Sequence, residues 1–262
     1  MFKKPLNALL PVTACALVSL ICIPAIAAPI NYGNFAGSTV NFLNVTEDSA
    51  TDPTPLFGAP TVAGDGMSFS PLASFTALAS AGSIDLTDGK LNTTIQSINP
   101  GTGSIQNIVV NERGDYTLAG VGTTGTSVSV SAPVFLTLDE VDGVAITPVA
   151  LYSGNLAFTP SAGSYNLVSN PGNGIIWTGT LSIDVTAALL AHGIGGRATK
   201  LEYTMDNSLL ALSQVNSIAK IEKKNGIVGI TVNPPVPEPS SIALLGIGTL
   251  GLLLARLRRR QS

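Results

Sequence analysis

The segment Ser127-Val128-Ser129-Val130-Ser131 alternates polar and apolar residues without interruption. Successive side chains of an extended strand point to opposite faces, so the two valines lie on one face and the three serines on the other. A helix would instead repeat its apolar residues every three or four positions. The alternation therefore predicts a β-strand that buries its valine face and turns its serine face to solvent.

The surrounding chain has the composition of an all-β domain over residues 28–232. Short runs rich in Val, Ile, Leu, Phe and Tyr are separated by clusters of Gly, Ser, Thr, Asn and Asp, which is typical of strands joined by turns. About a dozen strands without intervening helices predict a single β-sandwich, with a jelly roll as one form it could take, rather than a parallel sheet. The other predicted strands are residues 39–45, 83–87, 91–98, 105–111, 115–121, 134–139, 144–152, 156–159, 175–185, 199–205, 209–214, 217–222 and 227–232.

Three short segments predict particular turns or a helix. Lys224-Asn225-Gly226-Ile227 places Asn-Gly between two apolar runs, which is the strongest short-range hairpin signal. Residues 139–143 form an acidic turn between two strands, in which Gly143 is free to take a positive φ. Residues 185–192 predict one short helix, ended by Gly193.

The N-terminal residues 1–27 have the parts of a secretory signal peptide. Lys3 and Lys4 form a positive start, an apolar stretch follows over residues 6–26, and small residues close it. We expect cleavage between Ala27 and Ala28, because a cut one residue later would place a proline directly after the scissile bond. A retained N-terminal membrane anchor is the alternative. Both cysteines lie inside this stretch, so the mature chain is predicted to contain no disulfide and no thiolate metal site.

Charge is distributed unevenly along the chain. Six of the 13 Lys and Arg residues lie at the two ends, whereas 15 of the 16 Asp and Glu residues lie between them. The exported segment is therefore acidic and lacks the basic surface that nucleic acids require. This balance excludes nucleic acid as a partner and is better suited to divalent cations than to anionic ligands.

The C-terminal residues change character after the last predicted strand. Residues 233–239, NPPVPEP, contain four prolines and predict a stiff, extended spacer. Residues 240–255 contain no charge and are followed by the basic sequence RLRRR, so residues 240–260 predict a short transmembrane segment with a basic stop. The arginines would remain cytoplasmic, which places the β-domain outside the membrane. A buried core helix, the alternative, fits poorly beside the proline spacer.

This tail resembles the PEP-CTERM sorting domain of Gram-negative bacteria that make exopolysaccharide. The motif Pro237-Glu238-Pro239, a short span with three glycines and a basic end occur in the expected order. The resemblance implies recognition of the tripeptide by an exosortase, a membrane protease-transpeptidase that would remove the tail. It also implies that the terminal arginines act as the stop signal. These are Arg256, Arg258, Arg259 and Arg260.

Hydrolytic and zinc chemistry have little support in the sequence. His192 is the only histidine and stands at the end of the predicted helix, where capping is a more ordinary role than catalysis. No G-x-S-x-G motif occurs, and one histidine without mature cysteines cannot form a usual zinc site. Trp177 lies on an apolar strand and is predicted to be core rather than a sugar-binding platform.

Acidic clusters leave one metal hypothesis open. Asp139, Glu140 and Asp142 could hold calcium, because hard carboxylate oxygens gathered in a turn are its preferred ligands. The alternative is a solvated acidic turn without metal. A second cluster contains Glu47, and neither cluster matches an EF-hand or a convincing glycosidase pair. Apart from this calcium, the sequence indicates no cofactor.

Together these observations predict a non-enzymatic surface or extracellular-matrix protein associated with exopolysaccharide or biofilm. It would pass the export translocon, stay transiently in the inner membrane through its C-terminal span, and end in the cell envelope or outside the cell. A carbohydrate-binding, lectin-like module is the alternative function. A hydrolase that uses acidic residues is a third.

Overall fold

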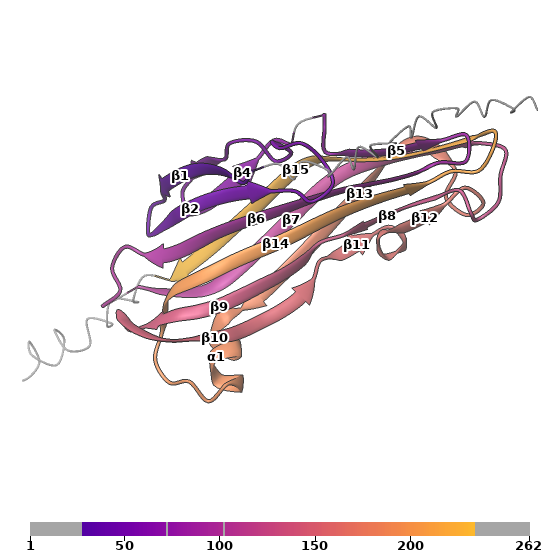
Figure 1. Cartoon of the computed structure of the whole chain (residues 1–262). Helices are drawn as coiled ribbons and strands as arrows, with labels where there is room; N and C mark the ends of the chain where they lie inside the picture. Colours follow the sequence, from indigo (N-terminus) through magenta and orange to yellow (C-terminus); the bar gives the residue numbers. More distant parts are fainter. Residues whose placement is uncertain (1–27, 72, 102, 234–262) are drawn as a thin grey trace, which may run out of the picture.

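The computed structural model describes residues 28–71, 73–101 and 103–233, the last five by their backbone alone. Two antiparallel sheets lie face to face and form an elongated sandwich (Figure 1). The all-β prediction is therefore confirmed. The predicted signal peptide, proline spacer, sorting motif and transmembrane segment lie almost wholly outside the described residues. No helix in the described part is long and apolar enough to cross a membrane.

The first sheet has β14 at its centre. On one side of β14 lie β6, β2 and β1 in turn, and on the other side β8 and β9 occupy successive stretches of its edge. β12 continues from β8, and β10 continues from β9. The strands are β1 (Ile30–Ala36), β2 (Val40–Asp48), β6 (Ile84–Ser97), β8 (Ser127–Ser131), β9 (Pro133–Val141), β10 (Val144–Asn155), β12 (Ser164–Asn166) and β14 (Ala198–Leu212).

The second sheet is built around the antiparallel pair of β7 and β15. β13 and β11 follow on the outer side of β7, whereas β4 and β5 share the other edge of β15 and β3 follows β4. The strands are β3 (Thr61–Ala63), β4 (Gly66–Phe69), β5 (Thr76–Ser80), β7 (Ser104–Gly120), β11 (Ala157–Thr159), β13 (Gly172–Asp184) and β15 (Ser217–Asn233). β15 is thus paired on both edges.

Alternating apolar residues of both sheets form one hydrophobic core. In β8, Val128 and Val130 are buried and the serines are not, as the alternation predicts. Trp177 is fully buried and packs edge-on against Phe158, with ring centroids 5.8 Å apart, so its predicted core position is confirmed. Because side chains from both sheets interdigitate here, any polar residue in this register is removed from water.

The short helix and the acidic turn are also confirmed. α1 (Val185–Ala191) lies at one end of the sandwich near β10 (Figure 1), and His192 is its C-cap. Asp184 caps its N-terminus by accepting a hydrogen bond from the backbone N–H of Ala187 at 2.8 Å. Between β9 and β10, Asp142 and Gly143 have φ values of 49° and 79°, the backbone of a two-residue hairpin. One 3₁₀ turn, η1 (Ser161–Gly163), precedes β12.

The hairpin predicted at Lys224–Ile227 is wrong. β15 runs straight through these residues, and neither Asn225 nor Gly226 takes a positive φ. The pairing of β15 with β7 shifts register between Lys223 and Asn225, which is the mark of a β-bulge. Two consecutive residues, Lys224 and Asn225, face outward, and the inward alternation resumes at Gly226. The Asn-Gly signal therefore marks an irregularity inside a long strand.

Candidate functional site

A buried polar cluster joins the two sheets near the middle of β14 and β15. Glu112 of β7, Asn207 of β14 and Lys223 of β15 all point into the sandwich and are almost completely buried. The ammonium of Lys223 forms an ion pair with Oε1 of Glu112, and neither side chain is exposed to solvent. The amide of Asn207 donates from Nδ2 to the same Oε1 atom at 2.9 Å. One carboxylate oxygen thus holds two nitrogen groups from opposite sheets.

Aromatic rings enclose the amine end of this cluster. Nζ of Lys223 lies 4.5 Å from the ring centroid of Phe57 and 5.3 Å from that of Phe75, within cation–π range. The two rings pack edge-on, 5.0 Å between centroids. They occupy the space over Gly89, which pairs with Asn207, since a Cβ there would lie 2.9 Å from Phe75 and 3.1 Å from Phe57. The absent side chain of Gly89 makes room for this cage.

Two polar atoms of the cluster have no hydrogen-bond partner among the residues that the structure describes. These are Oε2 of Glu112 and Oδ1 of Asn207. Buried polar atoms are nearly always paired, because an unpaired one costs about 1–3 kcal/mol. Burial lowers the pKa of Lys223, although the Glu112 carboxylate opposes this effect. Burial, and then the charge of Glu112, raises the pKa of the neighbouring Tyr203 well above its usual value.

A second buried carboxylate lies close to the cluster. Glu47 of β2 is fully buried and accepts hydrogen bonds from the backbone N–H groups of Leu56, Phe57 and Gly58, the last two at 3.0 and 3.2 Å. The Tyr32 hydroxyl donates to Oε2, the oxygen that also accepts from Gly58, at 2.7 Å. Burial and this contact raise the pKa of Tyr32. Glu47 thereby fixes the loop that carries Phe57 of the cage.

The outward face of β15 carries a separate set of charges. Glu222 pairs with Lys220 at 2.6 Å and with Lys224 at 2.7 Å, and Lys224 also pairs with Asp115 of β7. Burial alone would raise the pKa of Glu222, but hydrogen bonds and charge from the two lysines outweigh it and lower the pKa to about 2. The strand thus alternates between solvent-facing ion pairs and the buried Lys223.

These surface pairs predict an acid-dependent loss of stability. The folded pKa of Glu222 is depressed below its ordinary 4.5, so its contribution is complete above that pH and lost as the pH falls towards 2. We expect Glu222→Gln to lower the melting temperature at pH 6, and the difference from wild type to shrink between about pH 4.5 and 2. Thermal melts at four pH values measure it. A difference that stays constant down to pH 2 contradicts this assignment.

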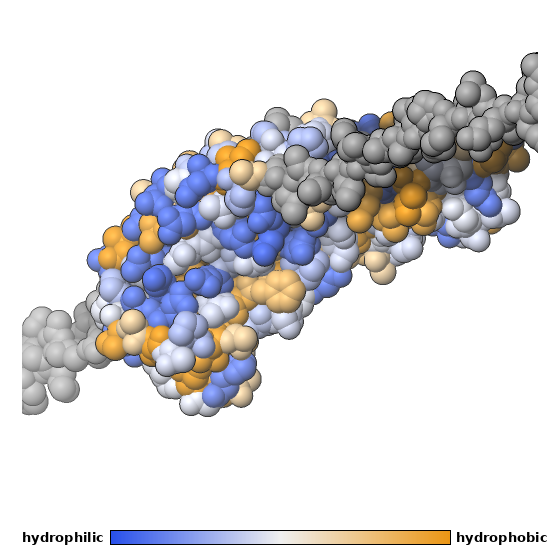
Figure 2. Space-filling view, viewed as in Figure 1, coloured by the Kyte–Doolittle hydropathy of each residue, from blue (hydrophilic) through white to orange (hydrophobic). Residues whose placement is uncertain are grey.

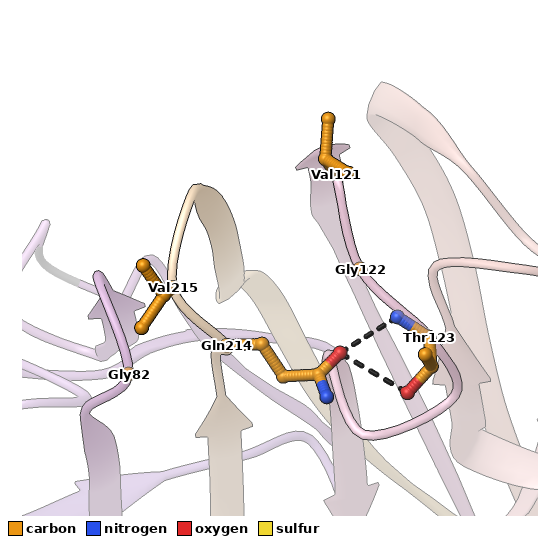
Figure 3. Close-up of a pocket in the computed structure, with 6 residues that line it drawn as sticks. All are labelled: Gly82, Val121, Gly122, Thr123, Gln214 and Val215. Carbon is orange, nitrogen blue, oxygen red and sulfur yellow. Dashed lines mark hydrogen bonds between the residues drawn. The ribbon is translucent and has the colours of Figure 1, made fainter.

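A shallow pocket lies where several turns meet at the end of the sandwich opposite α1. It has a volume of about 520 Å³ and lies between the β5–β6, β7–β8 and β14–β15 connections. Oε1 of Gln214 accepts hydrogen bonds from the backbone N–H and the hydroxyl of Thr123, at 2.6 and 3.1 Å (Figure 3). Gln214 therefore ties two of these turns together. Val121 and Val215, which also line the pocket, are 77% and 70% exposed.

The outer face of the first sheet carries a polar groove of about 290 Å³. Its lining is rich in hydroxyl and amide groups, and the hydroxyl of Thr204 donates to Oδ1 of Asn92 at 2.9 Å. The residues are Asn44, Thr46, Asn92, Thr93, Thr94, Glu202, Tyr203 and Thr204. Figure 2 shows hydrophilic residues over much of the visible surface, with apolar residues both around the end where α1 lies and toward the opposite end.

Two of the three carboxylates predicted to bind calcium at the acidic turn contact protein donors. Asp142 pairs with Arg197 at 2.7 Å, and Glu140 accepts a hydrogen bond from Thr199 at 2.9 Å. Asp139 and Glu140 are neighbours on β9, so their side chains leave the strand on opposite faces. Among the described residues, no three His, Cys, Asp or Glu side chains are grouped so that they could hold a metal ion. Calcium binding at this turn therefore stays a prediction.

The tail matches a known sorting signal. Residues 235–260 match the family model of the PEP-CTERM protein-sorting motif, directly after the end of β15. The chain carries a PEP-CTERM sorting motif. Such a motif marks an exported protein that is transiently anchored in the membrane and is the substrate of a sorting enzyme. The match covers the tail alone, so the identity of the β-sandwich does not follow from it.

Other comparisons say little about the sandwich. No curated protein matches the chain. TmCBM61, solved with β-1,4-galactotriose, has 6% identity and a TM-score of 0.21 over 64% of this chain and 70% of its own. The family 11 xylanase of Neocallimastix patriciarum has 10% identity and a TM-score of 0.21 over 79% and 99%. A family 12 xyloglucanase of Bacillus licheniformis has 9% identity and a TM-score of 0.20, over 79% of this chain and 99% of its own. TM-scores this low establish neither fold nor function.

Proposed function

We propose that this chain is a non-enzymatic protein of the cell surface or extracellular matrix, delivered by export and processed at its PEP-CTERM tail. Residues 1–27 would direct export through the translocon and be removed between Ala27 and Ala28. Residues 240–260 would hold the protein in the inner membrane until an exosortase-type protease acts at the motif in residues 233–239. The β-sandwich would then remain in the envelope or outside the cell.

The position of the sorting motif at the end of β15 carries this proposal. β15 pairs with β7 along its whole length, from Ser217 opposite Gly120 to Asn233 opposite Ser104, and with β4 and β5 on its other edge. A pull along β15 from the tail would therefore load many of its hydrogen bonds at the same time. An edge strand, which is bonded on one side only, would resist less. This arrangement suits a domain that is held by its C-terminus.

The chemistry of the sandwich is consistent with a role that involves no turnover. Its most reactive grouping, Lys223 with Glu112, is closed to solvent, so a substrate from outside has no access to it. The exposed acidic turn is occupied by protein contacts from Arg197 and Thr199. The proposed role therefore depends on the surface of the domain, not on a catalytic centre.

The polar groove on the first sheet supports an association with exopolysaccharide. Side chains such as Asn92 and Thr204 offer hydrogen-bond donors and acceptors that suit sugar hydroxyls. The same groove is the observation that favours the alternative, a lectin-like module with a preference for one sugar. The two differ in selectivity: a matrix protein binds its host's polymer through many weak contacts, whereas a lectin prefers one glycan.

Fractionation of the native host separates these functions. We expect the protein to sediment with the exopolysaccharide matrix of wild-type cells and to pass into the medium in a strain that makes no exopolysaccharide. Equal distribution in both strains would contradict the association. A glycan array with the purified protein tests the alternative, since micromolar binding to a single glycan, lost in Asn92→Ala, would favour the lectin. Turnover of any polysaccharide would contradict the non-enzymatic proposal.

A further inference from the structure

We propose that Lys223 and Asn207 form an intramolecular isopeptide bond, promoted by Glu112, that joins the two sheets of the sandwich covalently. The three side chains are brought together from three strands and are all buried. Both the Lys223 amine and the Asn207 amide contact one oxygen, Oε1 of Glu112. Two groups that hydrogen-bond the same atom are near neighbours, so the nucleophile and the electrophilic amide are held side by side.

The reaction needs only these three groups. Lys223 first passes one proton to Glu112, which leaves a neutral amine and a carboxylic acid. Nζ then attacks Cγ of Asn207, while the acid protonates the amide oxygen and stabilises the tetrahedral intermediate. As the C–Nδ2 bond breaks, the Nζ proton is transferred through Glu112 to Nδ2, which leaves as ammonia. The amide oxygen then returns its proton to Glu112, which passes it to the departing ammonia. A neutral Lys223–Asn207 amide and an ammonium ion are the products, the Glu112 carboxylate is regenerated, and no oxidant or cofactor is consumed.

The unpartnered atoms of the cluster fit this chemistry. Oε2 of Glu112 and Oδ1 of Asn207 are both buried acceptors without a donor. If the carboxyl group of Glu112 is protonated on Oε2, it supplies the donor that Oδ1 of Asn207 lacks. The carboxyl group and the amide can then form two hydrogen bonds with each other. Two unpaired acceptors are costly to bury when Glu112 is a charged carboxylate, but they can pair with each other when Glu112 is a neutral acid.

The surroundings favour the neutral reactants and protect the product. The rings of Phe57 and Phe75 and the absence of a side chain at Gly89 keep water from the amine. A dry, apolar setting disfavours a separated ammonium and carboxylate, so it lowers the cost of proton transfer within the pair. Water is also the reagent that would hydrolyse the amide once formed, and it has no access to this position.

The bond would lie on the strand that leads into the tail. β15 leads directly into residues 235–260, and its Lys223 would be joined to β14, the central strand of the opposite sheet. Load from the C-terminus would then pass into both sheets through a covalent link. The formation of the bond is independent of the proposed function, because the cluster is complete within the folded sandwich.

Peptide mass mapping of the purified full chain tests the proposal. After trypsin, we expect a branched peptide in which residues 201–220 are joined through Asn207 to residues 221–224. Its mass should be about 17 Da below the sum of the two peptides, the mass of one ammonia. Trypsin should also fail to cleave after Lys223, because an acylated lysine has lost the charge that the protease requires. Fragmentation should place the branch on Asn207 and Lys223.

Matched variants assign the chemistry. Lys223→Met combined with Glu112→Gln keeps the volume and removes both charges, a replacement that buried ion pairs often tolerate, and should give only unbranched peptides. Asn225→Gln is the control and should keep the branched peptide. This variant removes the Asn225-Gly226 step, where cyclisation of the backbone also releases ammonia but joins no two peptides. Unmodified peptides 201–220 and 221–223 from the wild-type protein would overturn the proposal. So would a loss of about 18 Da with Lys223 joined to the Glu112 peptide, residues 91–113.

Discussion

Replacement of Glu47 by alanine is expected to lower the free energy of unfolding by about 3–5 kcal/mol. The carboxylate is fully buried and is the acceptor for three consecutive backbone N–H groups, at residues 56–58, and for the hydroxyl of Tyr32. Its removal leaves these donors buried without partners and releases the loop that carries Phe57. Urea unfolding followed by circular dichroism measures the loss.

Asp48→Ala is the matched control for this prediction. Asp48 is the next residue on β2, is only partly buried and faces away from the core. Its replacement should therefore change the free energy of unfolding by less than about 0.5 kcal/mol. If Glu47→Ala is as mild as Asp48→Ala, the buried carboxylate does not hold the loop.

Replacement of Glu238 by alanine is expected to abolish processing of the tail. The glutamate is the one charge in the Pro-Glu-Pro motif, and we expect the flanking prolines to favour the extended shape that a protease groove accepts. The variant should be exported and then remain in the membrane fraction with its full C-terminal mass. Replacement of Ser240 by alanine, outside the tripeptide, provides the control and should be processed normally. Equal processing of Glu238→Ala and wild type would contradict recognition of the motif.

Replacement of the terminal arginines is expected to impair membrane retention rather than processing. Replacement of the four arginines by serine removes charges that each cost up to about 3 kcal/mol at the centre of the bilayer. The positions are Arg256, Arg258, Arg259 and Arg260. The short uncharged span should then slip through the membrane, so that protein appears outside the cell with its tail intact. Retention of this variant in the membrane, processed at the normal rate, would show that the arginines are not the stop signal.

Alternation and turn chemistry were sufficient to predict the architecture. The alternating segment Ser127–Ser131 is β8, residue for residue, and the Asp142-Gly143 turn and the capped helix are where the sequence places them. Each of these signals is local, because it depends on side-chain period or backbone φ at adjacent residues. β3 and β12 were missed because three residues carry little periodicity, and β5 was missed because Thr76–Ser80 lacks the regular alternation of polar and apolar residues seen in β8.

The sequence predicts two short strands in place of each of four long strands. The predicted breaks within β6, β7, β14 and β15 contain Gly89, Glu112, Asn207 and Lys223, respectively. Glycine, asparagine and charged residues between apolar runs usually indicate a turn. Here they point into the sandwich, where the polar side chains satisfy one another across the sheets and Gly89 makes room for the aromatic rings. The four apparent turns are therefore one buried site.

A signal for this site was present in the alternation itself. Lys223 continues the inward series of Ala219 and Ile221, and Glu112 continues that of Ile108 and Val110. Each charged residue is in phase with the core, which is unusual unless it is paired. The sequence could not say which residues pair, because partners from different sheets meet only through the three-dimensional fold. The contacts of the acidic turn with Arg197 and Thr199 were hidden for the same reason, since both residues are distant from it in sequence.

The mass of the C-terminal peptide of the native protein tests the central claim most directly. The measurement needs only protein purified from the envelope or medium of its own host, digested and sequenced by mass spectrometry. We predict that the mature chain ends at or near the Pro237-Glu238-Pro239 motif and that residues 240–260 are absent from it. Mature protein that still carries Arg260 would contradict sorting and processing, and would make the tail a permanent membrane anchor.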